Sequence, residues 1–378
     1  MNVPLPEMAS TRPDRDSSLT AERTVAGLTP SSAINFRTDG NLSPGEPASM
    51  RLVRCLITRL EALSSNMRSQ SSATDLSRET VGLILGGIGV AIFSLTLPAT
   101  RAAVPAFGGW TVGIGRAVVA ALLGAILLAA KRPPRPPRRL FGRLAIVAGG
   151  VIIGFPLFTA LALIHVPASR GAIVVGFLPA TTAIVAAVRN GERPSPQFWL
   201  AATGGLVTVM VFAVATGAGG RPEPADGLLV LAVVSAAIGY AEGAAVTAEL
   251  GGWQTISWAL VLAAPVTTPI AAIALLSHGV VDPTTKAVVG LVYVCVFSMF
   301  LGFFAWYAGL GIAGVARVSQ IQLVQPILTL GWAALLLDET ITTGAMAAAV
   351  AVLAFVAAAK RSPVRPDSGV HTSLARSD

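Results

Sequence analysis

The sequence predicts an all-α integral membrane protein with ten transmembrane helices, arranged as two inverted five-helix repeats. Hydrophobic residues make up 53% of the chain and charged residues only 12%, and the mean hydropathy is +0.71. A soluble domain carries roughly 25% charged residues, so this composition is that of a membrane protein. The apolar residues fall into ten runs of spanning length, and the two halves of the chain share a spaced pattern of residues.

The ten predicted spans follow from the lengths of the apolar runs, since about 20 predominantly apolar residues cross a bilayer as a helix. Three breaks between neighbouring runs are short, and Gly or Pro supplies the break. These are HVPASR, ELGGW and AGLGIAG. The predicted spans are Val81–Pro98, Trp110–Ala130, Leu144–Ile164, Ser169–Val188, Phe198–Ala215, Leu228–Thr247, Thr255–Leu276, Ala287–Ala308, Gly314–Leu337 and Thr343–Ala359.

The basic residues predict the orientation of these spans. They gather in the second and fourth loops and after the last span, whereas the other loops carry few. Cytoplasmic loops are enriched in Lys and Arg, so we expect a multi-pass protein of the bacterial inner (plasma) membrane with both termini in the cytoplasm. The net charge of +8 is spread over loops and tails rather than one basic face, so no nucleic-acid partner is predicted. The predicted partner is the lipid bilayer.

Two polar tails flank the spans. Residues 1–78 are rich in Ser, Thr, Pro and Arg and lack the apolar stretch of a cleavable signal peptide, so a disordered cytoplasmic tail is expected. Within it, Met50–Leu63 has apolar residues at helical spacing with Arg between, which predicts a short helix on an anionic membrane surface. The alternative is a true start at Met50 or Met67. Residues 361–378 form a second cytoplasmic tail.

An internal repeat divides the membrane part. The stretches SRGAIVVGFLPATTAIVAAVRNGERPS and ARVSQIQLVQPILTLGWAALLLDETIT align without a gap. The matched pairs, each 147 residues apart (317 − 170), are Arg170 with Arg317, Pro179 with Pro326 and Glu192 with Glu339. A second echo, FGGW and LGGW, is separated by 143 (253 − 110). Five spans per repeat is an odd number, so the predicted repeats, residues 79–216 and 217–360, must have opposite orientations. Inverted repeats are typical of transporters, with the binding site between the halves near the midplane.

These features resemble the drug/metabolite transporter superfamily, in its EamA-type branch of ten-helix carriers. The resemblance rests on a Pro followed thirteen residues later by Glu at the end of the fourth and ninth spans, where GERPS and LDETIT are the two copies. It covers residues 79–360 and none of the N-terminal tail. Such proteins mostly export small metabolites, amino acids or toxic compounds, so the resemblance implies an exporter.

Glu242 is the first candidate site residue, because it lies with Tyr240 in a run that is otherwise apolar or small. A charge near the bilayer centre costs about 2.5 to 3.5 kcal/mol on insertion scales, so Glu242 should face the protein interior or a wet cavity. It would bind a cationic part of the substrate or take up a proton, which would make protons the coupling ion. The alternative is a structural Glu, neutral or paired with Arg, that locks two helices.

Arg116 is the predicted counter-charge of Glu242, because it too lies deep within a span. Together they would bind the acid and the amine of an amino acid. The alternative is that the long Arg116 side chain extends to the outer membrane surface.

The ninth span carries a stripe of polar residues. Gln322, Gln325 and Thr329 fall at i, i+3 and i+7, on one face directed at a cavity or a neighbouring helix. With Arg317 they would bind substrate, or they would hydrogen-bond other helices.

The repeated residues suggest gates. Arg170 and Arg317 would begin their helices at opposite faces of the membrane and hold opposite gates, while Pro179 and Pro326 would bend their helices around the cavity. Glu192 and Glu339 each precede a helix and are expected to cap it. An aromatic series at helical spacing in the eighth span would stack a planar substrate or pack in the core or against lipid; its members are Tyr293, Phe297, Phe300 and Phe304.

The sequence thus favours a secondary carrier that exports a small metabolite, amino acid-like or drug-like, by alternating access. It has no GxxxxGK[ST] motif, which argues against direct ATP drive. All three histidines fall in loops or the tail and the two cysteines lie far apart, so neither an enzyme nor a metal or other cofactor is predicted. The alternatives are an intramembrane enzyme and a non-transporting structural membrane protein. A monomer or a homodimer is expected.

Overall fold

The computed structural model describes residues 75–189, 193–216, 222–313, 318, 321–361 and 364–365. All of them belong to the unit formed by residues 72–378. The helix expected at Met50–Leu63 lies outside the described residues, as do Glu192 and Arg317.

The first half of the membrane part forms five helical segments. α2 (Asp75–Ser94) and α3 (Thr96–Phe107) make the first, and α4 (Gly109–Lys131) is the second. The third contains α5 (Arg138–Val147), the π-helix η1 (Ala148–Gly154) and α6 (Phe155–Ala162). α7 (Ala168–Val175) and α8 (Leu178–Arg189) make the fourth, and α9 (Pro196–Thr216) is the fifth.

The second half repeats this order. α10 (Pro224–Leu250) and α11 (Gly252–His278) are the sixth and seventh segments. The eighth contains α12 (Thr285–Val292), the π-helix η3 (Tyr293–Leu301) and α13 (Gly302–Ala313). The ninth contains the 3-10 helix η4 (Gln322–Val324) and α15 (Gln325–Leu337), and α16 (Thr343–Arg361) is the tenth. Two short antiparallel strands, β1 (Arg193–Pro194) and β2 (Val364–Arg365), pair beyond the helices.

Among the described residues, eight helical segments are long and apolar enough to span a membrane, and two shorter apolar helices, Gln322–Leu337 and Thr343–Ala359, complete the ten. The predicted fold class, ten helices in two inverted repeats, is confirmed. The two π-helices support the repeat as well, because they occupy matching segments. η1 ends at Gly154 and η3 at Leu301, 147 residues later (301 − 154).

The predicted boundaries differ most from the structure in the first and third segments. The first span was expected to end at Pro98, but α3 continues to Phe107. Pro98 lies in the first turn of α3, where its missing N–H costs no helical hydrogen bond. The third segment begins at Arg138 rather than Leu144, because α5 is amphipathic: Leu140 and Leu144 are buried while its arginines lie at the surface.

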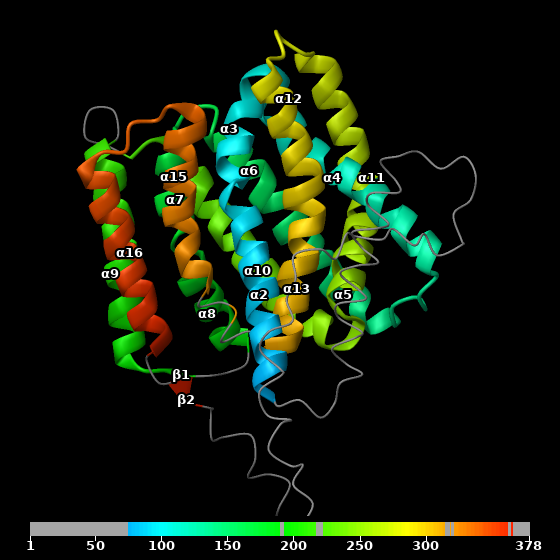
Figure 1. The fold of residues 1–378 in the computed structure, drawn as a ribbon, viewed down its shortest axis with the longest axis horizontal. Helices are drawn as coiled ribbons and strands as arrows, with labels where there is room; N and C mark the ends of the chain where they lie inside the picture. The colour runs from blue at the N-terminus through cyan, green and yellow to red at the C-terminus, as the bar shows by residue number, and fades with distance from the viewer. Residues whose placement is uncertain are drawn as a thin grey trace, which may run out of the picture. The chain divides into compact units, whose positions relative to one another are not determined.

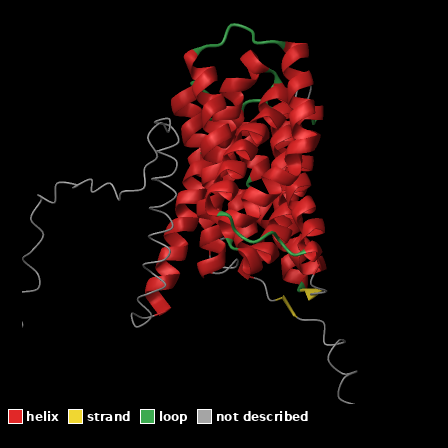
Figure 2. Cartoon of the chain, turned by 90° about the vertical axis from the view of Figure 1, so that its right-hand side faces the viewer, coloured by secondary structure: helices red, strands yellow, loops and turns green. Residues whose placement is uncertain are grey.

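The helices run along one direction, with their connections at two ends (Figure 2). We call the end where α2 begins and α16 ends the terminal end, and the end where α11 ends and α12 begins the distal end (Figure 1). α9 packs against α16 on one side of the bundle and α4 against α11 on the other (Figure 1). Between them α2 packs against α13, and α10 packs against α6 and η1, so each half contacts the other in equivalent places.

The duplicated Gly-Gly pair explains two of the turns. Gly108 and Gly251 adopt φ values of 74° and 83°, which L-residues with a side chain rarely adopt, and each separates two helices. The following glycines allow close packing. A Cβ at Gly109 would lie 2.7 Å from Ile164 Cδ1, and one at Gly252 would lie 2.8 Å from the backbone nitrogen of Ala308.

Candidate functional site

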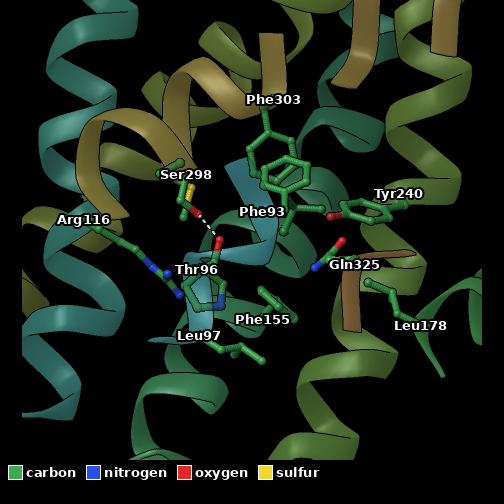
Figure 3. Close-up of a pocket in the computed structure, with 13 residues that line it drawn as sticks. Phe93, Thr96, Leu97, Arg116, Phe155, Leu178, Tyr240, Ser298, Phe303 and Gln325 are labelled. Carbon is green, nitrogen blue, oxygen red and sulfur yellow. Dashed lines mark hydrogen bonds between the residues drawn. The ribbon is translucent and has the colours of Figure 1, made fainter. Parts of the chain in front are cut away.

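A central cavity lies between the two repeats (Figure 3). Its volume is about 20 Å³, room for about one water molecule, so the site is nearly closed in this conformation. Four lining residues of the second repeat stand at positions equivalent to four lining residues of the first repeat. The matched pairs are Val151 with Ser298, Pro156 with Phe303 and Leu178 with Gln325, each 147 apart (298 − 151), and Leu97 with Tyr240, 143 apart (240 − 97). The cavity therefore lies where equivalent surfaces of the inverted halves meet.

The two halves contribute unequal chemistry to this cavity. The second repeat supplies the hydroxyl and amide groups of Tyr240, Ser298 and Gln325, where the first has Leu97, Val151 and Leu178. The hydroxyls of Thr96 and Ser298 hydrogen-bond each other at 2.8 Å across the halves, from α3 to η3. A symmetric architecture thus presents an asymmetric site.

Arg116 supplies the charge of the cavity. It projects from the first half of α4, it is 1% exposed, and its Nε and Nη2 atoms are buried without a hydrogen-bond partner among the described residues. Figure 3 shows the guanidinium reaching in from one side of the cavity toward Thr96, with Tyr240 and Gln325 across from it. A buried guanidinium without an anion is costly, so this group is poised for a ligand.

Aromatic side chains form much of the remaining wall. The ring of Phe93 lies 4.8 Å from that of Phe303, and the ring of Tyr240 lies 6.2 Å from Phe303, centroid to centroid. Phe155 closes the cavity from α6. These rings suit the apolar body of an organic molecule.

The polar stripe of the ninth segment lines a second, adjacent cavity. Gln322, Gln325 and Thr329 all contact it, and Gln325 also lines the central cavity. Thr329 donates a hydrogen bond to the carbonyl oxygen of Ser94 at 2.8 Å, whereas the Oε1 atom of Gln325 is buried without a partner in the described part of the chain. Pro179 and Pro326 line the same second cavity, so the two duplicated prolines meet between the halves.

Glu242 does not reach the central cavity. It is 1% exposed and forms ion pairs with Arg189 of α8 and, at 3.8 Å, with Arg143 of α5. We call these three residues the terminal ion cluster. The predicted Arg116–Glu242 pair is therefore wrong, because α10 turns Glu242 toward the basic residues at the terminal end of the first repeat.

Arg170 forms the corresponding contact at the distal end. Its Nε and Nη2 atoms donate to Asp226 at 2.9 and 2.5 Å, and its Nη1 donates to Glu223 at 3.0 Å. We call these three residues the distal ion cluster. Arg170 is 5% exposed and joins α7 of the first repeat to the start of α10 in the second.

Glu339 caps a helix other than the one expected. Its carboxylate accepts hydrogen bonds from the backbone N–H groups of Ala168 and Ser169 at 2.8 and 2.9 Å. These groups begin α7, so Glu339 caps a helix of the opposite repeat rather than the helix that follows it.

The aromatic series predicted in the eighth segment does not line the central cavity. Phe297 is largely exposed, and Phe300 and Phe304 pack on each other at 4.8 Å. Phe303 faces the cavity instead, because the π-helix η3 changes the helical period on which the series was predicted.

Several cavity residues were not predicted, among them Thr96, Phe93, Phe155 and Ser298. Ser298 and Phe303 stand 147 residues after Val151 and Pro156, but those two apolar residues carry no signal of their own in the sequence, so the repeat spacing could not have found the pairs. No group of three or more His, Cys, Asp or Glu that could hold a metal ion occurs among the described residues. The described residues that line the central cavity include no Asp, Glu, His or Lys.

Comparison with known proteins decides the family. The model of the EamA-like transporter family matches the chain twice, at residues 80–214 and 224–359. The chain belongs to the EamA-like transporter family. This EamA-like transporter is 41% identical over 292 residues to the "Uncharacterized transporter YdeK" of Bacillus subtilis (strain 168), covering 76% of this chain and 99% of that protein.

A solved structure supports the fold of this EamA-like transporter. The structure, named only "Crystal structure of protein", aligns with a TM-score of 0.53 at 17% identity and covers 74% of this chain and 96% of its own. At that identity the likeness concerns the fold alone. The family and the apolar helices make the chain a multi-pass membrane transporter.

Proposed function

We propose that this transporter exports a small organic substrate by alternating access, with the central cavity as the substrate site. One observation carries the proposal: the cavity lies where matched positions of the inverted repeats meet, and its polar groups converge there in an otherwise apolar bundle. In transporters built from inverted repeats, the site stays fixed while one half moves against the other. Export follows from the carriers that the chain resembles.

The two ion clusters support this mechanism. Each joins α10 of the second repeat to helices of the first, the distal ion cluster at one end and the terminal ion cluster at the other. With both formed, the halves are held together on each side of the cavity. Opening one end requires one cluster to separate, so Arg170 is a gating residue at the distal end. Pro179 and Pro326 between the halves would let the fourth and ninth segments bend.

The basic connections support a cytoplasmic location for the terminal end. Lys131, Arg132 and Arg135 follow α4 at that end, and Arg139 pairs with Glu249 at 2.7 Å nearby. Cytoplasmic loops are enriched in such residues. Substrate would enter from the terminal end and leave at the distal end.

A cysteine in the cavity tests alternating access. Ser298→Cys would be introduced into a chain carrying Cys55→Ser and Cys295→Ala, and a membrane-impermeant thiol reagent applied to right-side-out and inside-out vesicles. The cavity cysteine should be labelled from both sides. As a control, Ser277→Cys near the end of α11 should be labelled only from outside the cell. Labelling of the cavity cysteine from one side only would refute alternating access, and labelling of the control only from inside would reverse the orientation.

A further inference from the structure

The described part of the central cavity contains one charge and no countercharge. Arg116 lines it, and no Asp or Glu among the described residues does. Glu223 and Asp226 pair with Arg170, Glu339 caps α7, and Glu242 pairs with arginines of α5 and α8. The site is therefore electropositive.

From this arrangement we infer that the substrate is a monoanionic carboxylic acid with an apolar body and no ammonium group. The inference rests on the proposed function and names the substrate class of its site. The guanidinium fork of Arg116, with buried Nε and Nη2 donors free, matches the two oxygens of a carboxylate. A bound carboxylate would give the buried charge the partner that it lacks among the described residues.

The rest of the wall explains why the ligand should have no amine. An ammonium group would enter a water-poor site beside a fixed positive charge, with no carboxylate among the described lining residues to pair with it. An amino acid would therefore bind less well than the same molecule without its amine. Glu242 was predicted to bind the amine of an amino acid whose acid group binds Arg116. It does not line the cavity, because it is held in the terminal ion cluster.

The apolar lining and the single charge set the remaining features of the ligand. Phe93, Phe155 and Phe303 would contact its body, and the amide of Gln325 lies across the cavity from Arg116 as a hydrogen-bonding group (Figure 3). A phosphate ester also suits a guanidinium, but it carries a second negative charge that one arginine cannot neutralise in an apolar site. A carboxylate is the better match.

Four probes that share one ring system test this inference. They are 3-phenylpropionate, phenylalanine, 2-phenylethylamine and phenyl phosphate, titrated into the purified full-length protein and followed by calorimetry and by tryptophan fluorescence. Trp306 reports on the site because its ring lies 6.1 Å from that of Tyr240. We expect 3-phenylpropionate to bind at least ~10-fold more tightly than the other three. Equal or tighter binding of phenylalanine, the amine or the phosphate, or no binding of the acid, would overturn the inference.

Variants of Arg116 assign the effect to that residue. Arg116→Gln should weaken binding of 3-phenylpropionate roughly 10- to 100-fold, since hydrogen bonds to charged groups contribute on that scale. Arg116→Lys keeps the charge without the fork and should fall between. Arg101→Gln is the matched control, because Arg101 donates to the carbonyl oxygen of Leu163 at 2.6 Å and does not line the cavity. Should Arg116→Gln fail to fold, the affinity of Arg116→Lys for 3-phenylpropionate is compared with that of Arg101→Gln. An affinity of Arg116→Lys equal to that of the parent would contradict the role of the guanidinium fork.

Flux through proteoliposomes separates this inference from the proposed function. Binding of 3-phenylpropionate without any flux would leave the anion site intact and refute transport through it. Flux of the amine that 3-phenylpropionate does not inhibit would leave transport intact and refute the anionic substrate class.

Discussion

The distal ion cluster provides the sharpest test of gating, through Asp226→Asn. Asp226 accepts two hydrogen bonds from Arg170, at 2.9 and 2.5 Å, and one from the backbone N–H of Glu223 at 2.8 Å. Asparagine keeps the shape of the side chain but removes its charge and presents an amide N–H₂ to the guanidinium. Arg170 would then remain buried with only one anionic partner, Glu223.

The size of the effect follows from the burial of the pair. Arg170 and Asp226 are both buried, and removing one partner of a buried ion pair costs about 3 to 5 kcal/mol. Glu223 stays 3.0 Å from Arg170 Nη1 and offsets part of the loss, so we expect the lower limit, about 3 kcal/mol. If the cluster exists only while the distal end is closed, that loss shifts the equilibrium between closed and open roughly 100-fold toward open, since each 1.4 kcal/mol is a factor of ten.

The cavity cysteine Ser298→Cys measures this shift. In the Asp226→Asn background its labelling from the distal side should accelerate, and its labelling from the terminal side should slow. Asp338→Asn is the matched control at the same end, because its pair with Lys286 is 3.9 Å long and highly exposed. Equal labelling rates in Asp226→Asn and the parent would refute the gating role. A loss of thermal stability with unchanged labelling would identify the cluster as a structural link between helices.

Two further predictions concern helix packing and the terminal end. Gly252→Ala should destabilise the protein by about 1 to 3 kcal/mol, because its Cβ would lie 2.8 Å from the backbone of Ala308. In the control Gly227→Ala the Cβ meets no atom within 4 Å, so the melting temperature should stay the same or rise slightly, since Ala favours a helix more than Gly does. Equal melting temperatures for the two would contradict the packing described. Glu242→Gln should fold, because its partners Arg143 and Arg189 are each 41% exposed and can turn to water. It should also speed labelling of the cavity cysteine from the terminal side. An unchanged labelling rate would exclude Glu242 from the gate.

The sequence alone determined the number of helices, their inversion and the first candidates for the site. Run lengths reveal the spans because the thickness of the bilayer sets the length of an apolar helix. An odd number of spans in each repeat requires inversion whatever the packing. Arg116 and Gln325 could be found because a charge or amide inside an apolar run is costly and needs a protein-facing position.

Only the tertiary structure decided which side chains meet. A helix that is apolar on every side has no stripe that marks its inner face, so its rotation about its own axis is not encoded in its own periodicity. That rotation brings Glu242 to Arg143 and Arg189, and leaves Arg116 in the cavity with no acidic partner among the residues that the structure describes. The π-helix η3 had a similar effect. It changes the helical period and so turns the side chains that follow it, and Phe303 rather than Phe304 lines the central cavity. Contacts between helices far apart in the chain set these rotations, and they form only when the two repeats pack together.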